Sequence, residues 1–171
     1  CAVANGLSNG TVSLVEGSVD IGGTRTAIAQ QLAEVLGIPV EDVNPQVADT
    51  DTIGYTSNTG GSGVAFKSGW AAYEAAHDVV RQLIKRAALV WETDVDQVEY
   101  LDGALQHKSD PELRMTFKEI AAMLDGTGGP VVGSANLNPG GSGGSYAANI
   151  VDVEVDPDTG KVEILRYTAF Q

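Results

Sequence analysis

The sequence predicts an α+β fold, with a mostly antiparallel sheet and one long and two shorter helices packed on it. Short apolar runs joined by Asn-Gly, Asp-Gly and Asp-Pro-Asp-Thr-Gly turns favour hairpins of antiparallel strands. Three other segments carry apolar residues at three- and four-residue steps, which is typical of helices. The resulting order, β-β-α-β-α-β-β-α-β-β-β, places several strands next to each other in the chain and so favours antiparallel pairing.

The composition fits one acidic domain that spans residues 1–171. With 171 residues, 43% of them hydrophobic, the chain is long and apolar enough for a single packed core. Its 23 acidic and 10 basic side chains give a net charge of −13, which would repel nucleic acid and anionic membranes. No apolar run approaches the roughly 18 residues of a membrane span. We expect a cytoplasmic protein with no nucleic-acid partner and no membrane association.

The chain is expected to begin with a hairpin and a helix. Two apolar-rich runs, 2–7 and 11–19, flank Ser8-Asn9-Gly10, and Asn-Gly between such runs is a strong hairpin signal. A helix is expected over 27–37, with Gly37 as its C-cap. The apolar residues that share one face of this helix are Ile28, Leu32, Val35 and Leu36.

A short strand is expected at 46–48, after Pro45, and a long polar loop follows at 49–63. The only sizeable apolar groups in this loop are Ile53 and Tyr55. A loop of this length inside a compact domain is usually functional or disordered.

The longest helix is expected over 64–92. The apolar stripe along it consists of Phe66, Trp70, Tyr73, Val80, Ile84, Ala87 and Trp91. His77 fills a gap in this stripe, and the simplest interpretation is a half-buried packing residue.

Turn and capping signals predict the remaining elements. Further strands are expected at 97–101, 104–107, 131–136, 146–155 and 162–170, with a short helix at 116–124 and a Pro- and Gly-rich loop at 138–144. Asp102-Gly103 favours a hairpin turn, and Thr116 with Glu119 fits a capping box. The residues whose partial alternation suits a strand with one well-buried face are Ile150, Val151, Val153 and Val155.

Two loops rich in Gly, Thr and Ser each precede an expected helix. The first is Gly22-Gly23-Thr24-Arg25-Thr26, and the second is Thr59-Gly60-Gly61-Ser62. A helix start presents unpaired N–H groups and a partial positive charge, so both loops are candidate cradles for a phosphate or a polar heterocycle. Neither loop matches a P-loop or a G-x-G-x-x-G fingerprint, and two tight turns that cap helices are the alternative.

Other chemistry-bearing residues give weaker signals. Arg25 is either a phosphate ligand or a surface charge, and Asp49 with Asp51 is either a divalent-cation pair or a turn cap. His107 has a structural interpretation at a strand end. With two histidines and one cysteine, no protein-ligated metal site is expected. No G-x-S-x-G elbow occurs, and we name no catalytic residue.

Three stretches taken together resemble the molybdenum-binding subunit of the xanthine dehydrogenase and aldehyde oxidase family. They are residues 17–30 with Leu36-Gly37-Ile38-Pro39, residues 49–69 with Thr59-Gly60-Gly61-Ser62, and residues 146–162 with Asp156-Pro157-Asp158-Thr159-Gly160. The similarity covers nearly the whole chain in the right order. No single motif is decisive, and the joint order is the specific feature.

The resemblance implies an enzyme that hydroxylates aldehydes or N-heterocycles with water as the oxygen donor. Its cofactor would be molybdenum held by molybdopterin. The implied partners are the remainder of the molybdenum subunit and iron–sulfur and flavin subunits or domains. The residues implied to bind the cofactor are Gly22, Gly23, Thr24, Thr59, Gly60, Gly61 and Ser62.

The chain also departs from the family pattern. Many members carry Gly-Gln-Gly at the first loop, which has no glutamine here, and near relatives often have Arg where this chain has Gly63. The family's catalytic glutamate lies in a later Gly-Glu segment that this sequence does not include. We therefore expect a fragment that supplies cofactor-binding loops and is inactive alone, so whether the chain is itself an enzyme stays open.

Two other interpretations stay open. The chain could be a non-catalytic binding or self-assembly module that retains the scaffold, or an unrelated phosphate-binding α+β domain. Unpaired strand edges would make the isolated chain a homo-oligomer.

Overall fold

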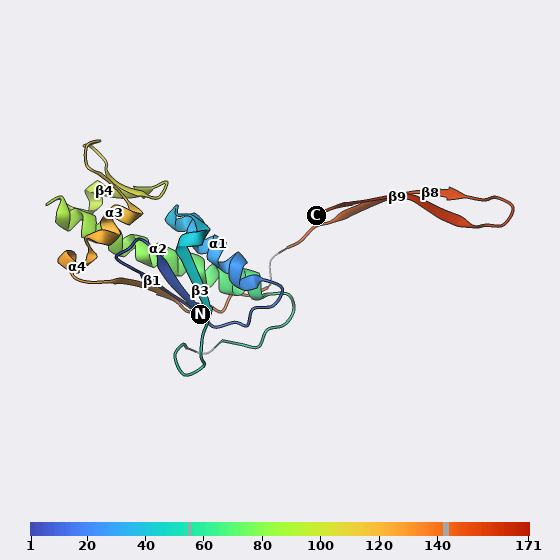
Figure 1. Ribbon diagram of the computed structural model, residues 1–171, viewed down its shortest axis with the longest axis horizontal. Coiled ribbons are helices and arrows are strands. Elements are labelled where there is room, and N and C mark those ends of the chain that lie inside the picture. The colour runs from blue at the N-terminus through green and yellow to red at the C-terminus, as the bar shows by residue number, and fades with distance from the viewer. Residues whose placement is uncertain (55, 142–143) are drawn as a thin grey trace.

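A four-stranded sheet in the order β3-β2-β1-β7 forms the base of the molecule (Figure 1). The computed structural model describes residues 1–54, 56–141 and 144–171. The strands of the sheet are β1 (Ala2–Gly6), β2 (Val12–Glu16), β3 (Val43–Val47) and β7 (Val131–Ala135). Strands β1 and β2 form the predicted hairpin, β7 pairs antiparallel with β1, and β3 pairs parallel with β2.

Strand β3 begins earlier than predicted. It starts at Val43 and includes Pro45, which we expected to precede the strand. Since β3 lies at the edge of its sheet, the missing N–H group of Pro45 can face away from β2 without the loss of a ladder hydrogen bond.

Two long helices cover one face of this sheet (Figure 1). Helix α1 (Thr24–Leu36) packs against β3 and α2, and α2 (Val64–Val90) packs against β1 and β7. Helix α1 begins three residues before the predicted start. Its predicted C-cap, Gly37, has a φ of 58° and donates its N–H to the carbonyl oxygens of Ala33 and Glu34, so the C-cap is confirmed.

The buried face of α2 coincides only in part with the predicted stripe, in which Ala87 is buried and Val80, Ile84 and Trp91 pack partly buried against the core. Its buried residues are mostly small: Val64, Ser68, Gly69, Ala71, Ala72, Ala75, Ala76, Val79, Leu83, Ala87 and Ala88. Trp70 and Tyr73 are 42% and 44% exposed. The reason is close packing, because a Cβ atom on Gly133 of β7 would lie 2.0 Å from the carbonyl oxygen of Ala75. A face built for such close approach must consist of small residues.

A second, three-stranded sheet and two short helices lie at the far end of α2. The sheet consists of β4 (Val98–Leu101), β5 (Ala104–His107) and β6 (Arg114–Thr116), and the helices are α3 (Phe117–Ala122) and α4 (Leu124–Thr127). Short 3₁₀ turns occur at η1 (Val40–Asp42) and η2 (Val95–Gln97). The capping box of Thr116 and Glu119 is confirmed, whereas β6 and α4 were not predicted.

The last two strands, β8 (Ala148–Val155) and β9 (Val162–Phe170), form a hairpin that extends away from the rest of the molecule (Figure 1). The predicted buried face of β8 is wrong for this chain, since Ile150 is 57% and Val153 is 47% exposed. The physical reason is that no other described element covers the hairpin.

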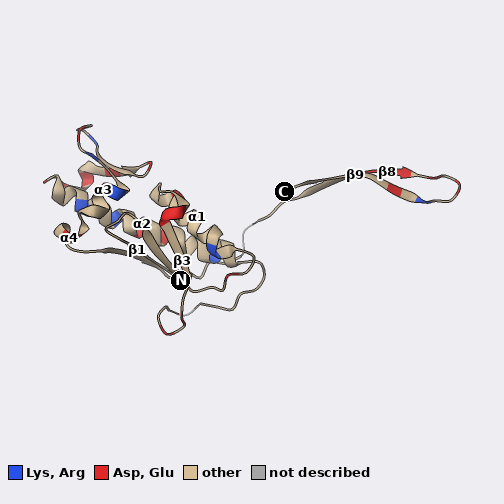
Figure 2. Cartoon of the chain, viewed as in Figure 1, with Lys and Arg blue, Asp and Glu red and all other residues tan. Residues whose placement is uncertain are grey.

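The predicted α+β class with mostly antiparallel pairing is confirmed, although the described strands form three sheets where one was expected. Tyr55 of the expected 49–63 loop and residues 142–143 of the expected 138–144 loop lie outside the described residues. Acidic side chains are distributed over the body and the hairpin (Figure 2). The negative charge is therefore a general surface property and marks no single site.

Candidate functional site

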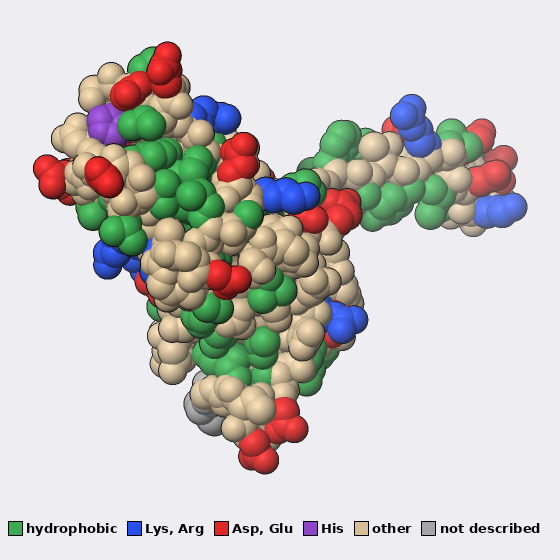
Figure 3. Space-filling view, turned by 60° about the vertical axis from the view of Figure 1, so that its left-hand side comes forward, with side chains coloured by type: hydrophobic (Ala, Val, Ile, Leu, Met, Phe, Trp, Pro, Cys, Tyr) green, Lys and Arg blue, Asp and Glu red, His purple; other side chains and the backbone are tan. Residues whose placement is uncertain are grey.

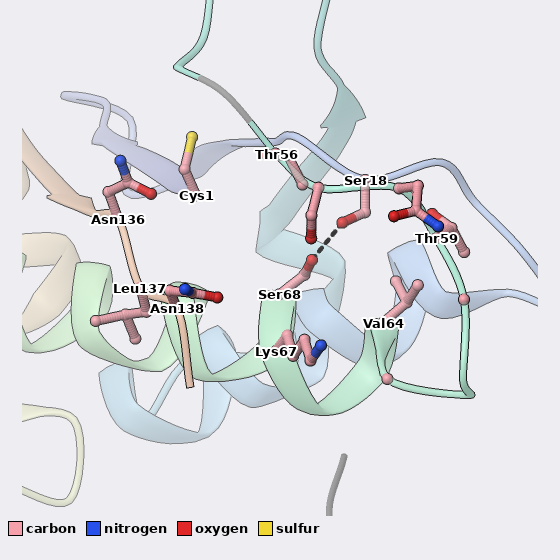
Figure 4. A pocket seen from close by; sticks show the side chains of 14 residues that line it. Cys1, Ser18, Thr56, Thr59, Val64, Lys67, Ser68, Asn136, Leu137 and Asn138 are labelled. Carbon is pink, nitrogen blue, oxygen red and sulfur yellow. Dashed lines mark hydrogen bonds between the residues drawn. The ribbon is translucent and has the colours of Figure 1, made fainter. Parts of the chain in front are cut away.

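A pocket of about 410 Å³ opens beside the first turn of α2 (Figure 4). This volume is within the range of about 300–1,000 Å³ that is typical of small-molecule sites. Its walls come from the segment after β2, the loop before α2, the start of α2 and the segment after β7. The residues that line it are Cys1, Ser18, Thr56, Ser57, Asn58, Thr59, Gly60, Gly63, Val64, Lys67, Ser68, Asn136, Leu137 and Asn138.

The lining combines polar side chains with apolar surface and has a local charge opposite to that of the whole protein. Hydroxyl and amide side chains dominate it, and Lys67 is the one charged residue among the described residues that line it. Whole-protein charge would repel an anion, but a lysine without a carboxylate beside it in the same wall attracts one at short range. The pocket is therefore suited to an anionic, hydrogen-bonding ligand.

The start of α2 adds hydrogen-bond donors to this wall. Gly61 and Ser62 have φ values of 62° and 55°, and this left-handed turn reverses the loop into the helix. Within the described part of the chain, the backbone N–H groups of Val64, Ala65 and Phe66 have no acceptor. The positive end of the α2 dipole and these N–H groups lie next to the pocket, because Gly63 and Val64 line it.

The start of α1 differs, because its own residues already occupy the N–H groups there. The Arg25 N–H donates to Asp20 Oδ1 over 3.0 Å, the Thr24 N–H to the Ile21 carbonyl over 3.3 Å, and the Thr26 N–H to the Gly23 carbonyl over 3.1 Å. The N–H groups of residues 24–26 are therefore already used within the chain and are not open to a ligand. Arg25 also forms an ion pair with Asp20, at 3.3 Å.

The first loop still offers unhindered backbone. Gly22 and Gly23 have φ values of 63° and 80°, and no atom lies within 4 Å of a Cβ built on either. They are exposed, and Thr24 is half-buried beside them. None of the three lines the pocket, so their role in cofactor binding stays a prediction.

The second loop lies at the pocket. Thr59 and Gly60 line it, and Gly61 and Ser62 form the turn just beyond its wall. Their contact with the cofactor stays a prediction.

Sequence reasoning missed Lys67, Ser18 and Ser68. The signal for Lys67 was a basic residue one turn after a glycine-rich loop, where a side chain can reach back toward the helix start. Ser18 and Ser68 gave no such signal, because they are separated by 50 residues and only the fold brings them together.

A buried junction supports the wall of the pocket. Ser18 and Ser68 are 6% and 3% exposed, and their hydroxyl groups are hydrogen-bonded to each other (Figure 4). Gly17 lies against Thr56, whose Oγ1 would be 2.1 Å from a Cβ built on Gly17. These contacts attach the segment after β2 to α2 and to the loop before it.

Glu16, the last residue of β2, lies behind this junction and is fully buried. Its Oε2 accepts a hydrogen bond from the Ser18 N–H over 2.9 Å, while its Oε1 has no partner among the described residues. Burial raises the pKa of Glu16 above its ordinary value of 4.5, and the Ser18 hydrogen bond opposes that effect only in part.

The raised pKa makes the stability of the chain depend on pH. Below the ordinary pKa, Glu16 is neutral in both the folded and the unfolded chain; as pH rises, the unfolded chain ionises first and the folded state loses stability. Glu16→Gln is therefore expected to raise the free energy of unfolding at neutral pH and to change it little at acidic pH. Urea unfolding over this pH range measures the difference, and parallel profiles for the two proteins would contradict it.

The remaining candidate residues have structural roles. Asp49 Oδ1 accepts the Asp51 N–H over 2.9 Å, which is the turn-cap alternative. His107 Nε2 lies 3.1 Å from Thr93 Oγ1, and the ring of His77 contacts that of Tyr73 edge to face at 4.4 Å. In the described ranges, no group of three or more His, Cys, Asp or Glu residues could hold a metal ion.

The chain belongs to a known family. The chain is a member of the molybdopterin cofactor-binding domain family, whose model matches residues 2–171. Molybdopterin, the cofactor expected from the resemblance, is thus the cofactor of the family. No described helix has both the length and the apolar character needed to cross a membrane, and the cytoplasm as compartment stays a prediction.

Individual relatives agree with this assignment. The chain is 30% identical to the 6-hydroxypseudooxynicotine dehydrogenase complex subunit gamma of Paenarthrobacter nicotinovorans, over 93% of this chain and 21% of that protein. It is 29% identical to the carbon monoxide dehydrogenase large chain of Afipia carboxidovorans, over 86% of this chain and 19% of that protein.

Solved structures show the same fold. The structure of a Cu,Mo-CO dehydrogenase in its carbon monoxide reduced state matches 98% of this chain and 22% of its own chain, with a TM-score of 0.82 and 27% identity. Quinoline 2-oxidoreductase from Pseudomonas putida 86 shares the fold with a TM-score of 0.77 at 22% identity. The chain thus spans about a fifth of the length of the curated relatives it matches.

Proposed function

We propose that this chain supplies molybdopterin-binding loops to a molybdenum-dependent hydroxylase or dehydrogenase that oxidises aldehydes or N-heterocycles with water. The observation that carries the proposal is the pocket at the start of α2, where Lys67 lies beside N–H groups that have no acceptor among the described residues, in a strongly acidic protein. Membership of the molybdopterin cofactor-binding family supports the identity of the ligand.

In this proposal each part of the pocket has a distinct task. The N–H groups at the start of α2 and the Lys67 ammonium group bind the phosphate of the cofactor, as helix N-termini and lysines bind phosphates in other folds. Thr59, Gly60, Gly61 and Ser62 shape the loop that closes over it. Gly22, Gly23 and Thr24 form a second, open surface for the rest of the cofactor, where the missing side chains of the glycines permit close approach.

The cofactor, when bound, supplies the redox chemistry, and this chain supplies binding and orientation. We assign no catalytic residue to the chain and propose that it is inactive alone. Its partners are then the remainder of the molybdenum subunit and iron–sulfur and flavin subunits or domains. Two relatives, a dehydrogenase complex subunit and a dehydrogenase large chain, support a place in a multi-subunit enzyme.

The test is the molybdopterin content of the purified natural polypeptide that carries this chain, determined from the fluorescence of the oxidised pterin. The proposal expects bound pterin in the wild-type protein and a large decrease in the Lys67→Glu variant. Unchanged pterin content in that variant would contradict it.

The β8–β9 hairpin supports the alternative of a self-assembling module. Its pairs Val151–Tyr167, Val153–Ile164 and Val155–Val162 place six apolar side chains on one face, each between 41% and 64% exposed. Figure 3 shows apolar side chains along the projecting hairpin. An apolar strand surface of this kind marks an interaction site.

The isolated chain is expected to form a homo-oligomer through this face. Ile164→Asp should shift light scattering at tens of micromolar toward the monomer, because it places a charge in the apolar face. Thr168→Asp is the matched control, since its side chain lies on the opposite face with Ile150. A monomeric wild-type chain at this concentration would refute the expectation.

A further inference from the structure

Glu16 occupies a position where the pattern of β2 requires an apolar side chain. Val12, Leu14 and Glu16 alternate along the strand, and all three are fully buried on the face that the helices cover. A buried carboxyl group costs free energy unless hydrogen bonds compensate, and here one oxygen has no partner in the described chain. Packing alone does not account for this residue.

Among the described residues, the Glu16 carboxyl group makes one hydrogen bond, which lies where the strand ends. Backbone bonds hold the strand up to this point, since the Glu16 carbonyl accepts the Ala48 N–H over 2.9 Å and the Gly17 N–H donates to the Cys1 carbonyl over 3.1 Å. Beyond it, the Glu16 side chain accepts the N–H of Ser18. The carboxyl group therefore sets the direction in which the chain leaves the sheet.

That direction determines the wall of the pocket. Ser18 lines the pocket and meets Ser68 of α2 there, and Thr56 covers the adjacent Gly17. A shift of Ser18 would move its hydroxyl group away from Ser68 and open the wall between the segment after β2 and the loop before α2. The same segment continues into the loop that carries Gly22 and Gly23.

We propose that Glu16 is a positioning residue, which holds Ser18 in the wall of the molybdopterin pocket through the Ser18 N–H. The inference rests on the proposed function of that pocket. Glu16 acts without contact with the ligand, because it is not among the residues that line the cavity.

The charge of Glu16 gives this role a measurable pH dependence. The charged side chains that act on it are Asp20 and Arg25, and Lys67 lies in the pocket wall beyond Ser18. Ionised Glu16 places a negative charge two residues before Ser18, which lines the proposed site for an anion. Molybdopterin binding should therefore weaken as pH rises, and a neutral side chain at position 16 should remove that part of the pH dependence.

Two substitutions of Glu16 separate positioning from packing. Glu16→Gln keeps an oxygen acceptor for the Ser18 N–H, and its molybdopterin content should stay within about two-fold of wild type, as expected when one hydrogen bond is retained. Glu16→Met fills the space without an acceptor, and its content should fall by about five-fold or more through loss of that bond. Both contents are measured in the natural polypeptide, with thermal unfolding as the check on folding.

A purely structural role predicts another result, in which cofactor content follows thermal stability and Glu16→Met binds as well as Glu16→Gln. That outcome would overturn the inference. If Glu16→Met does not fold, the pH profile decides: as pH rises above the ordinary glutamate pKa of 4.5, cofactor affinity of the wild type should fall more steeply than that of Glu16→Gln, since only the wild type carries this carboxyl group. Identical slopes would also overturn it.

The Lys67→Glu variant distinguishes this failure from failure of the proposed function. If Lys67→Glu lowers cofactor content and Glu16→Met does not, the proposed function of the pocket is retained and only the proposed role of Glu16 is wrong. If neither variant lowers it, the proposed function itself is wrong.

Discussion

Lys67→Glu should lower the molybdopterin content of the natural polypeptide by at least about ten-fold, a change that corresponds to about 1.4 kcal/mol. The substitution replaces the one cation among the described lining residues by an anion, in the wall formed by the start of α2. Unit charges about 4 Å apart interact by up to about 4 kcal/mol near a protein surface, so a reversal of sign exceeds the energy that a ten-fold effect needs. The negative charge also opposes phosphate at the positive end of the helix.

A series at position 67 separates charge from shape. Lys67→Arg keeps the positive charge and should retain most of the cofactor, whereas Lys67→Met should give an intermediate content because it removes charge and adds no repulsion. Lys85→Glu is the matched control for net charge, since Lys85 is exposed on the same helix and does not line the pocket. Equal losses in Lys85→Glu and Lys67→Glu would show that only the overall charge matters.

Gly133→Val should destabilise the chain by about 3 kcal/mol or more, the upper end of the range for overpacking a core. A Cβ atom at Gly133 would lie 2.0 Å from the Ala75 carbonyl oxygen and 2.9 Å from the Val79 backbone nitrogen. Both atoms belong to the backbone of α2, so no flexible side chain can move aside. Strand β7 and helix α2 would have to separate, and the wall between α2 and Asn136 would open with them.

Urea unfolding measures this effect. Gly126→Ala is the control, since a Cβ at Gly126 meets nothing within 4 Å and Gly126 lies within α4. It should leave the midpoint unchanged or raise it slightly, because alanine favours a helix. A Gly133→Val protein that unfolds at the wild-type midpoint would show that β7 and α2 are not packed as closely as the structure indicates.

Local signals account for the elements that were predicted correctly. The Asn9-Gly10 and Asp102-Gly103 turns and the Thr116–Glu119 capping box each act within a few residues, so their effect can be read from adjacent positions. The C-cap at Gly37 is of the same kind. These signals define the ends of elements and say nothing about which face of an element is covered.

Contacts between segments that are distant in the sequence determine which faces of the elements are buried. Mostly small residues form the buried face of α2, because β7 and α1 approach it closely, whereas Trp70 and Tyr73 of the predicted stripe lie exposed. The exposure of the apolar face of the β8–β9 hairpin could not be predicted from local sequence either. Alternation of apolar residues indicates that a strand has an apolar face, but it does not show whether another element packs on that face.

In the candidate site, too, some residues could be found from local sequence and others are brought together only by the fold. The second glycine-rich loop was found from its composition and lies at the pocket, because a loop directly before a helix must lie at the helix start. The first loop was chosen on the same grounds, yet Asp20 occupies the N–H group of Arg25, a pairing that the spacing of five residues does not reveal. Glu16, Ser18 and Ser68 belong to the site only through the fold.

A structure of the natural polypeptide with molybdopterin bound tests the central claim most directly. The claim predicts the phosphate of the cofactor within hydrogen-bond distance of the Lys67 ammonium group and of the N–H groups at the start of α2, beside Thr59 and Gly60. A cofactor bound elsewhere, with this pocket free of any part of it, would contradict the account.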